Sequence, residues 1–63
     1  MCDYIIKRTN EDGIIEWYRD DIEHGKLWVA EIVYATQIEA KDLRHVLSMV
    51  GGEAVKLGGA KLN

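Results

Sequence analysis

Three polar residues, Asp42, His45 and Ser48, recur at intervals of three, and their types match the acid, base and nucleophile of a hydrolytic triad. A working triad also needs an oxyanion hole and a nucleophile on a strained or capped element. In a regular helix the backbone N–H groups are already bonded within the helix, so none is free to stabilise an oxyanion. We therefore interpret these residues as the polar flank of a helix and expect no catalytic residue.

Two glycine pairs, Gly51-Gly52 and Gly58-Gly59, raise the question of a phosphate-binding loop. Such a loop runs from a strand into a helix and ends in Gly-Lys followed by Ser or Thr. The first pair instead follows a predicted helix, and the second is followed by alanine and then lysine. Neither pair therefore predicts a phosphate site.

Metal ligands and disulfides are also poorly represented. His24 and His45 are far apart and belong to no CxxC or HxxxH spacing. The single cysteine, Cys2, can form no disulfide within the chain and suits a reducing compartment. We expect no metal, no cofactor and no enzymatic activity.

Charge is distributed unevenly along the chain, which indicates either a binding role for the acids or loops that the acids simply keep soluble. The chain has eleven acids and eight bases, for a net charge of −3. Residues 10–24 hold six acids against one arginine, a charge of −5, which leaves +2 for the remainder. This acidic block repels phosphate, which disfavours DNA or RNA as its ligand, and it steers toward a basic protein surface. The candidate contact acids are Glu11, Asp12, Asp20, Asp21 and Glu23.

We expect these acids to cluster at one end of the sheet. The alternative is two acidic tips, because successive turns of a meander usually lie at opposite ends of the shared strand. In that case the tip with Asp20, Asp21 and Glu23 is the stronger candidate contact, with Tyr18 beside it as an aromatic anchor.

The elements that must position these residues begin with a hairpin. Residues 4–9 are rich in β-branched and aromatic types, residues 10–13 form an Asn-Glu-Asp-Gly turn signal, and residues 14–19 are a plausible partner strand. The apolar residues between 13 and 25 also fit a helix, which remains the alternative.

The second half of the chain predicts a strand, a helix and a short strand. Residues 27–35 alternate as a strand, and Thr36 with Glu39 forms a capping box that opens a helix. Gly51 suits the C-terminal cap of that helix, and residues 53–57 are strand-like. The apolar stripe of the helix is Ala40, Leu43, Leu47 and Val50.

The predicted fold is α+β, a small antiparallel sheet in the order β-β-β-α-β with one helix packed on one face. Residues 1–57 form a single domain, and residues 58–63 form a flexible C-terminal tail. Alternation along the strands places Trp17 and Trp28 under the helix. The far face then carries Ile14, Tyr18, Val29 and Val33.

That apolar far face is a candidate interface, because contiguous apolar patches on small proteins usually mark a binding surface. The alternative is that the 20–26 loop or the tail covers part of it. We count Tyr18, Val29 and Val33 with the acids as candidate partner-binding residues.

Residues 31–40 read Glu-Ile-Val-Tyr-Ala-Thr-Gln-Ile-Glu-Ala. This stretch, followed by a helix and a short strand, resembles the layout of small phage-encoded host-takeover and anti-defence inhibitors. The resemblance covers residues 27–57 and rests on structural residues, so it assigns no binding residue. It implies a non-enzymatic inhibitor that docks on a host or defence machine at a surface meant for nucleic acid.

The leading hypothesis is a cytoplasmic binding protein, phage-encoded and acting in the host cytoplasm, that inhibits a nucleic-acid-handling host or defence protein. A first alternative is a structural or assembly module that forms a homodimer. A second is a weak nucleic-acid binder that uses Lys7, Arg8, Lys56 and Lys61, which the net charge opposes. No stretch approaches the roughly 20 apolar residues of a membrane span, so we expect no membrane partner.

Overall fold

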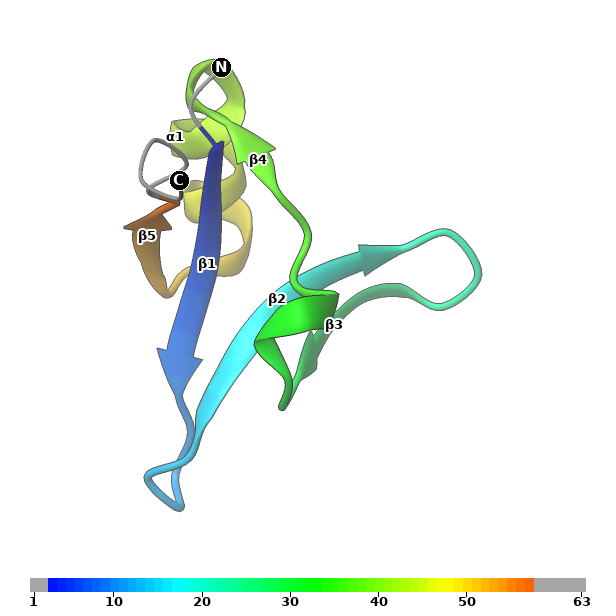
Figure 1. Cartoon of the computed structure of the whole chain (residues 1–63), viewed down its shortest axis with the longest axis vertical. Helices are drawn as coiled ribbons and strands as arrows, with labels where there is room; N and C mark the ends of the chain where they lie inside the picture. The colour runs from blue at the N-terminus through cyan, green and yellow to red at the C-terminus, as the bar shows by residue number, and fades with distance from the viewer. Residues whose placement is uncertain (1–2, 58–63) are drawn as a thin grey trace.

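The structure is a computed structural model that describes residues 3–57, and within them the chain forms an antiparallel sheet with one α-helix packed on it (Figure 1). The predicted α+β class and β-β-β-α-β layout are confirmed, with one short strand added before the helix. Cys2 and the predicted tail lie outside the described residues. No helix of the described part is long and apolar enough to cross a membrane. In chain order the elements are β1 (Asp3–Thr9), β2 (Ile15–Asp21), β3 (Gly25–Val29), η1 (Ile32–Tyr34), β4 (Ile38–Glu39), α1 (Ala40–Val50) and β5 (Glu53–Lys56).

Strand β1 is the centre of the sheet. Lys7 lies opposite both Trp17 of β2 and Glu53 of β5, so those two strands occupy opposite edges of β1. Tyr4 lies opposite Ile38 of β4 as well as a residue of β5, so β4 shares the β2 edge. Strands β2 and β4 therefore follow one another along the same edge of β1, and β3 pairs with β2 farther out.

The first hairpin forms as the sequence predicts. The Asn10 side-chain oxygen accepts hydrogen bonds from the backbone N–H groups of Asp12, at 2.8 Å, and Ile14, at 3.0 Å. Gly13 has a φ of 83°, which its missing Cβ allows. These local bonds hold the turn closed, so the hairpin is confirmed and the alternative helix over residues 13–25 is wrong.

The core lies between the sheet and α1. Ile6, Tyr18 and Ile38 are buried at its centre. Around them pack the partly buried Trp28, Leu43, Val46, Leu47 and Val50. The predicted stripe of the helix is confirmed except at its first residue, since Ala40 is exposed at the start of α1.

Tyr18 is a correction to the expected faces of the sheet. It lies directly opposite Trp28 in the β2–β3 pairing, and opposed side chains point to the same face. Their rings meet edge to face, with centroids 6.0 Å apart. Tyr18 is therefore 3% exposed in the core, and its placement on the open face beside an acidic tip is wrong.

The predicted start of the helix is also wrong. The helix begins at Ala40, and Glu39 at its N-cap makes no side-chain capping bond. Thr36 lies in an extended segment instead. Its N–H donates to the carbonyl of Tyr18 at 3.0 Å, and its hydroxyl accepts from the N–H of Asp20 at 2.8 Å. Thr36 therefore bonds the backbone edge of β2 and does not form the helix cap that the sequence pattern predicted.

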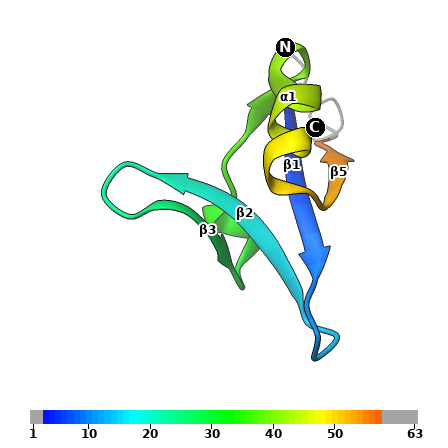
Figure 2. The same cartoon turned by 180° about the vertical axis from the view of Figure 1, so that it is seen from behind.

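The predicted strand over residues 27–35 ends early. β3 stops at Val29, and the chain then crosses over β2 through η1 to reach Thr36 on the far side of that strand. Figure 1 shows η1 in front of β2 and α1 behind β1, and Figure 2 shows α1 in front from the reverse side. The crossing segment therefore covers part of the face that the sequence predicted to be open.

Gly52 closes the turn between α1 and β5 against the core. Its φ is 90°, and a Cβ on it would lie 2.6 Å from the Lys7 carbonyl oxygen and 3.0 Å from Ile6 Cγ2. Gly13 also has a positive φ, but nothing lies within 4 Å of its would-be Cβ. A side chain at either position would strain the backbone, but only a side chain at position 52 would also collide with packed neighbours.

We expect Gly52→Ala to lower the free energy of unfolding by about 2–4 kcal/mol, because strain at positive φ adds to displacement of packed neighbours. Gly13→Ala should cost about 1–2 kcal/mol, from strain alone. Urea denaturation of both variants measures the difference. If both variants lost the same free energy of unfolding, the turn at Gly52 would not lie close against β1.

Candidate protein-binding surface

The outer part of the β2–β3 hairpin projects from the sheet as an arm, which we define as residues 19–27. Figures 1 and 2 both show its turn extending away from α1. The arm separates from β1 because the β1–β2 pairing ends at Trp17, whereas β2 pairs with β3 as far as Asp21 and Gly25. It therefore presents most of its surface to solvent.

Asp21 holds the turn of the arm. One carboxylate oxygen accepts the backbone N–H groups of Glu23, at 3.1 Å, and His24, at 2.9 Å. The same oxygen lies 2.9 Å from the Nδ1 atom of His24. Because these bonds are all local, residues 21–24 form a closed turn.

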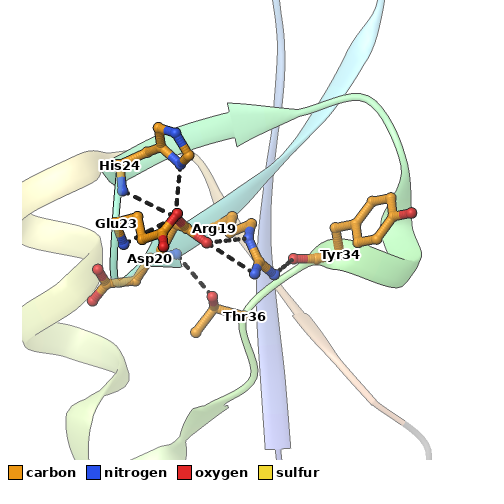
Figure 3. Close-up of polar contacts among 7 residues, drawn as sticks. Arg19, Asp20, Glu23, His24, Tyr34 and Thr36 are labelled. Carbon is orange, nitrogen blue, oxygen red and sulfur yellow. Dashed lines mark hydrogen bonds and ion pairs between the residues drawn. The ribbon is translucent and has the colours of Figure 1, made fainter.

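The other carboxylate oxygen of Asp21 joins the arm to η1 through Arg19. It accepts from Nε of Arg19 at 3.3 Å and from a terminal nitrogen of that guanidinium at 3.1 Å. The second terminal nitrogen of Arg19 donates to the carbonyl oxygen of Tyr34 at 3.0 Å (Figure 3). Arm and η1 are therefore bridged by one side chain.

The same contacts change the acidity of Asp21. Its hydrogen bond with the His24 side chain, followed by the His24 backbone N–H and Arg19, lowers the pKa of the carboxyl to about 2 from its ordinary 3.8. These partners bond the ionised form, which is why they favour it. Tyr18 shows the opposite direction, since burial, with the charge of Asp20 second, raises the pKa of its hydroxyl.

Exposed apolar side chains concentrate on β2, its two turns and η1. Ile22, at the tip of the arm, is 101% exposed, and Val33 of η1 is 76% exposed. Of the exposed large apolar residues in the described part, only Met49 lies outside residues 14–34. The six within that range are Ile14, Ile15, Ile22, Ile32, Val33 and Tyr34.

The predicted contact acids form two groups instead of one. Glu11 and Asp12 lie in the β1–β2 turn, and Asp20 and Glu23 lie at the arm, at the other end of β2 (Figure 1). All four are exposed. The expected single cluster is therefore wrong, because the turns at the two ends of one strand point in opposite directions.

The other predicted contacts differ in their accessibility. Val33 is well exposed, Val29 is half-buried, and Asp21 is half-buried and bonded within its own turn. Tyr18 lies in the core. Among these residues Asp20, Glu23 and Val33 are therefore exposed, but Asp20, two residues after Tyr18 in β2, points to the α1 face of the sheet and Val33 lies on the opposite face, with η1.

Ile22, Ile32 and Tyr34 are exposed residues that the sequence analysis missed. Ile22 stands among charged residues three positions before Gly25, which is the pattern of an apolar residue at a turn. No comparable signal marks Ile32 and Tyr34, because their alternation with Trp28 and Ala30 matches a buried strand face.

Two features elsewhere have weaker claims to function. Lys7, Arg8, Thr9, Gly52 and Glu53 line an open depression of about 320 Å³. Its arginine is already occupied, since the guanidinium bonds to Glu16 at 3.0 Å and lies 4.3 Å from the centre of the Trp28 ring. The Glu53 carboxylate also opposes an anion there.

The apparent triad on α1 has no nucleophile in position. The Ser48 hydroxyl donates to the backbone carbonyl of His45, three residues earlier, at 2.8 Å. Such back-bonding is the ordinary behaviour of serine within a helix. Among the described residues, no group of three or more His, Cys, Asp or Glu is arranged to hold a metal ion.

Comparison with protein-family models, with curated proteins and with solved structures found no match to this chain.

We expect Asp21→Asn to lower the stability of the protein at neutral pH in a pH-dependent way. A carboxyl whose pKa is lowered by folding contributes stability above its ordinary pKa, and that contribution is lost as the pH falls toward its folded pKa. The stability difference between wild type and the variant should therefore shrink between about pH 4 and pH 2.

Thermal melts across that pH range test this expectation. Asp20→Asn is the matched control, because the Asp20 side chain is exposed and accepts no hydrogen bond from the described residues. Asp20→Asn should lower the stability much less than Asp21→Asn, because it removes none of the bonds that hold the turn. A constant difference for Asp21→Asn would show that the turn does not depend on the ionised carboxylate.

Proposed function

We propose that this chain is a non-enzymatic binding protein that docks its arm and η1 on a basic surface of a nucleic-acid-handling protein and inhibits that protein. The observation that carries the proposal is the concentration of exposed apolar side chains on residues 14–34, with the exposed acids Asp20, Glu23 and Glu31 among them. Ile22, at full exposure, has the acids Asp20 and Glu23 beside it.

The two kinds of residue have different roles in binding. Exposed apolar side chains supply affinity when they are removed from water at an interface. Acids at the rim act on the association rate and on partner choice, because they attract a basic surface from a distance. The bonds of Asp21 and Arg19 already order the arm, which reduces the conformational entropy lost on binding.

The inhibitory part of the proposal comes from the charge and from the resemblance. A partner surface that attracts an acidic arm is also one that attracts nucleic-acid phosphates, so the two ligands would compete. The resemblance of residues 27–57 to small phage-encoded inhibitors supports the same role. Self-association remains a prediction of the sequence, and the like charge of two arms opposes pairing through them.

We expect the double variant Asp20→Asn, Glu23→Gln to slow association with a basic partner by roughly fivefold at low salt and to flatten its salt dependence. The partner is first captured from a bacterial lysate with the tagged full chain. Association rates are then measured for the purified pair over a range of ionic strengths. Competition between the chain and a DNA or RNA duplex for that partner tests inhibition.

The matched control is the double variant Glu11→Gln, Asp12→Asn, which removes the same charge at the opposite turn. It should slow association by much less. Equal effects of the two doubles would show that only the net charge matters and that the arm is not the contact. A partner that binds the chain and nucleic acid simultaneously would contradict inhibition.

A further inference from the structure

The hydrogen bonds of Thr36 reveal which way the backbone groups of β2 point. The Tyr18 carbonyl and the Asp20 N–H both point toward Thr36, on the side away from β3. In an extended strand successive residues direct their N–H and C=O groups to opposite edges. Arg19, between them, therefore directs its backbone groups toward β3.

The same alternation gives the orientation of β3. Arg19 lies directly opposite Leu27, so these residues form a hydrogen-bonded pair, and Leu27 directs its N–H and C=O groups inward. Its neighbours Lys26 and Trp28 direct theirs outward, to the free edge of the sheet. Within residues 3–57, no other strand pairs with that edge and no hydrogen bond reaches the outward groups.

A row of outward N–H and C=O groups is a template for another strand. Its surroundings decide which strand. The adjoining arm, residues 19–27, holds three acids against Arg19 and Lys26, a charge of −1, and the exposed Glu31, just past the end of β3, brings residues 19–31 to −2. A second copy would bring an equal negative charge to the same edge, whereas a basic segment would be attracted to it.

We propose that the free edge of β3 binds an extended, basic segment of the partner protein by β-strand addition. The inference rests on the proposed function and specifies its contact. Backbone groups of Lys26 and Trp28 bond the added strand. The exposed apolar residues of η1 and the acids of the arm flank it.

The first test uses the unmodified full chain and a capped ten-residue peptide of alternating lysine and valine. In the free protein the amide protons of Lys26 and Trp28 should exchange faster than that of Leu27, which is bonded to β2. The peptide should slow exchange at Lys26 and Trp28 by about tenfold or more and leave Leu27 little changed. Peptides with glutamate for lysine, or with a central proline, should not protect these amides.

The second test is a matched pair of variants at one exposed position. Lys26→Pro removes an outward N–H, which an edge strand tolerates, and should weaken peptide binding by roughly two- to tenfold, the worth of one hydrogen bond. Lys26→Ala keeps the N–H and removes a positive charge, so it should bind as well as wild type or better. Circular dichroism tests whether both variants fold. If the proline variant does not fold, amide exchange in the unmodified chain alone decides whether the peptide adds to the edge of β3.

The outcomes separate the edge from the proposed function. Peptide binding that leaves Lys26 and Trp28 unprotected, or that is equal in both variants, would overturn strand addition and leave a basic partner for the arm. Equal binding of the glutamate peptide would overturn the basic partner as well. Absence of binding by the lysine peptide, or protection of the edge by dimerisation of the chain alone, would overturn the proposed occupant.

Discussion

Two hydrogen bonds made by Thr36 determine how the sheet is divided. Where β2 separates from β1, its edge would lose the partner strand that satisfies its backbone groups. Thr36 bonds the Tyr18 carbonyl and the Asp20 N–H at that point, one through its N–H and the other through its hydroxyl. Unpaired backbone groups are costly where water is excluded, so this residue stabilises the separation of the strands and makes an arm compatible with a closed core.

The position of Thr36 also constrains the chain on either side of it. To bring residue 36 to the inner edge of β2, the chain that leaves β3 must cross the face of β2, and η1 is the crossing. Arg19 of β2 donates a hydrogen bond to the carbonyl of Tyr34 at the end of η1, and this bond fixes the crossing segment against β2. The exposed apolar residues of η1 are thus brought over β2, next to Arg19 of the arm, by the need to complete a strand edge.

The candidate surface could be predicted only in part from the sequence. The net charge of the acidic block depends on composition, which folding does not change, and the proposed preference for a basic partner rests on that charge. The exposure of Ile22 also has a local signal in its turn. The exposure of Ile32 and Tyr34 does not, because their alternation with other apolar residues is the pattern of a buried strand. Only the crossing over β2 shows that they remain outside the core.

The sequence by itself determined the features that depend on neighbouring residues: the Asn10 turn, the helical stripe with Leu43 and Leu47, and the positive φ of Gly51 after the helix. Tertiary structure decided which strand faces which. The burial of Tyr18 follows from its register against Trp28, and a shift of one residue would have turned it outward. The role of Thr36 was likewise decided at long range. A threonine hydroxyl can accept a hydrogen bond from the N–H of a helix N-terminus or from that of a strand edge. Here it accepts from Asp20, 16 residues earlier in the chain, whose N–H has no partner strand on that side of β2 within residues 3–57.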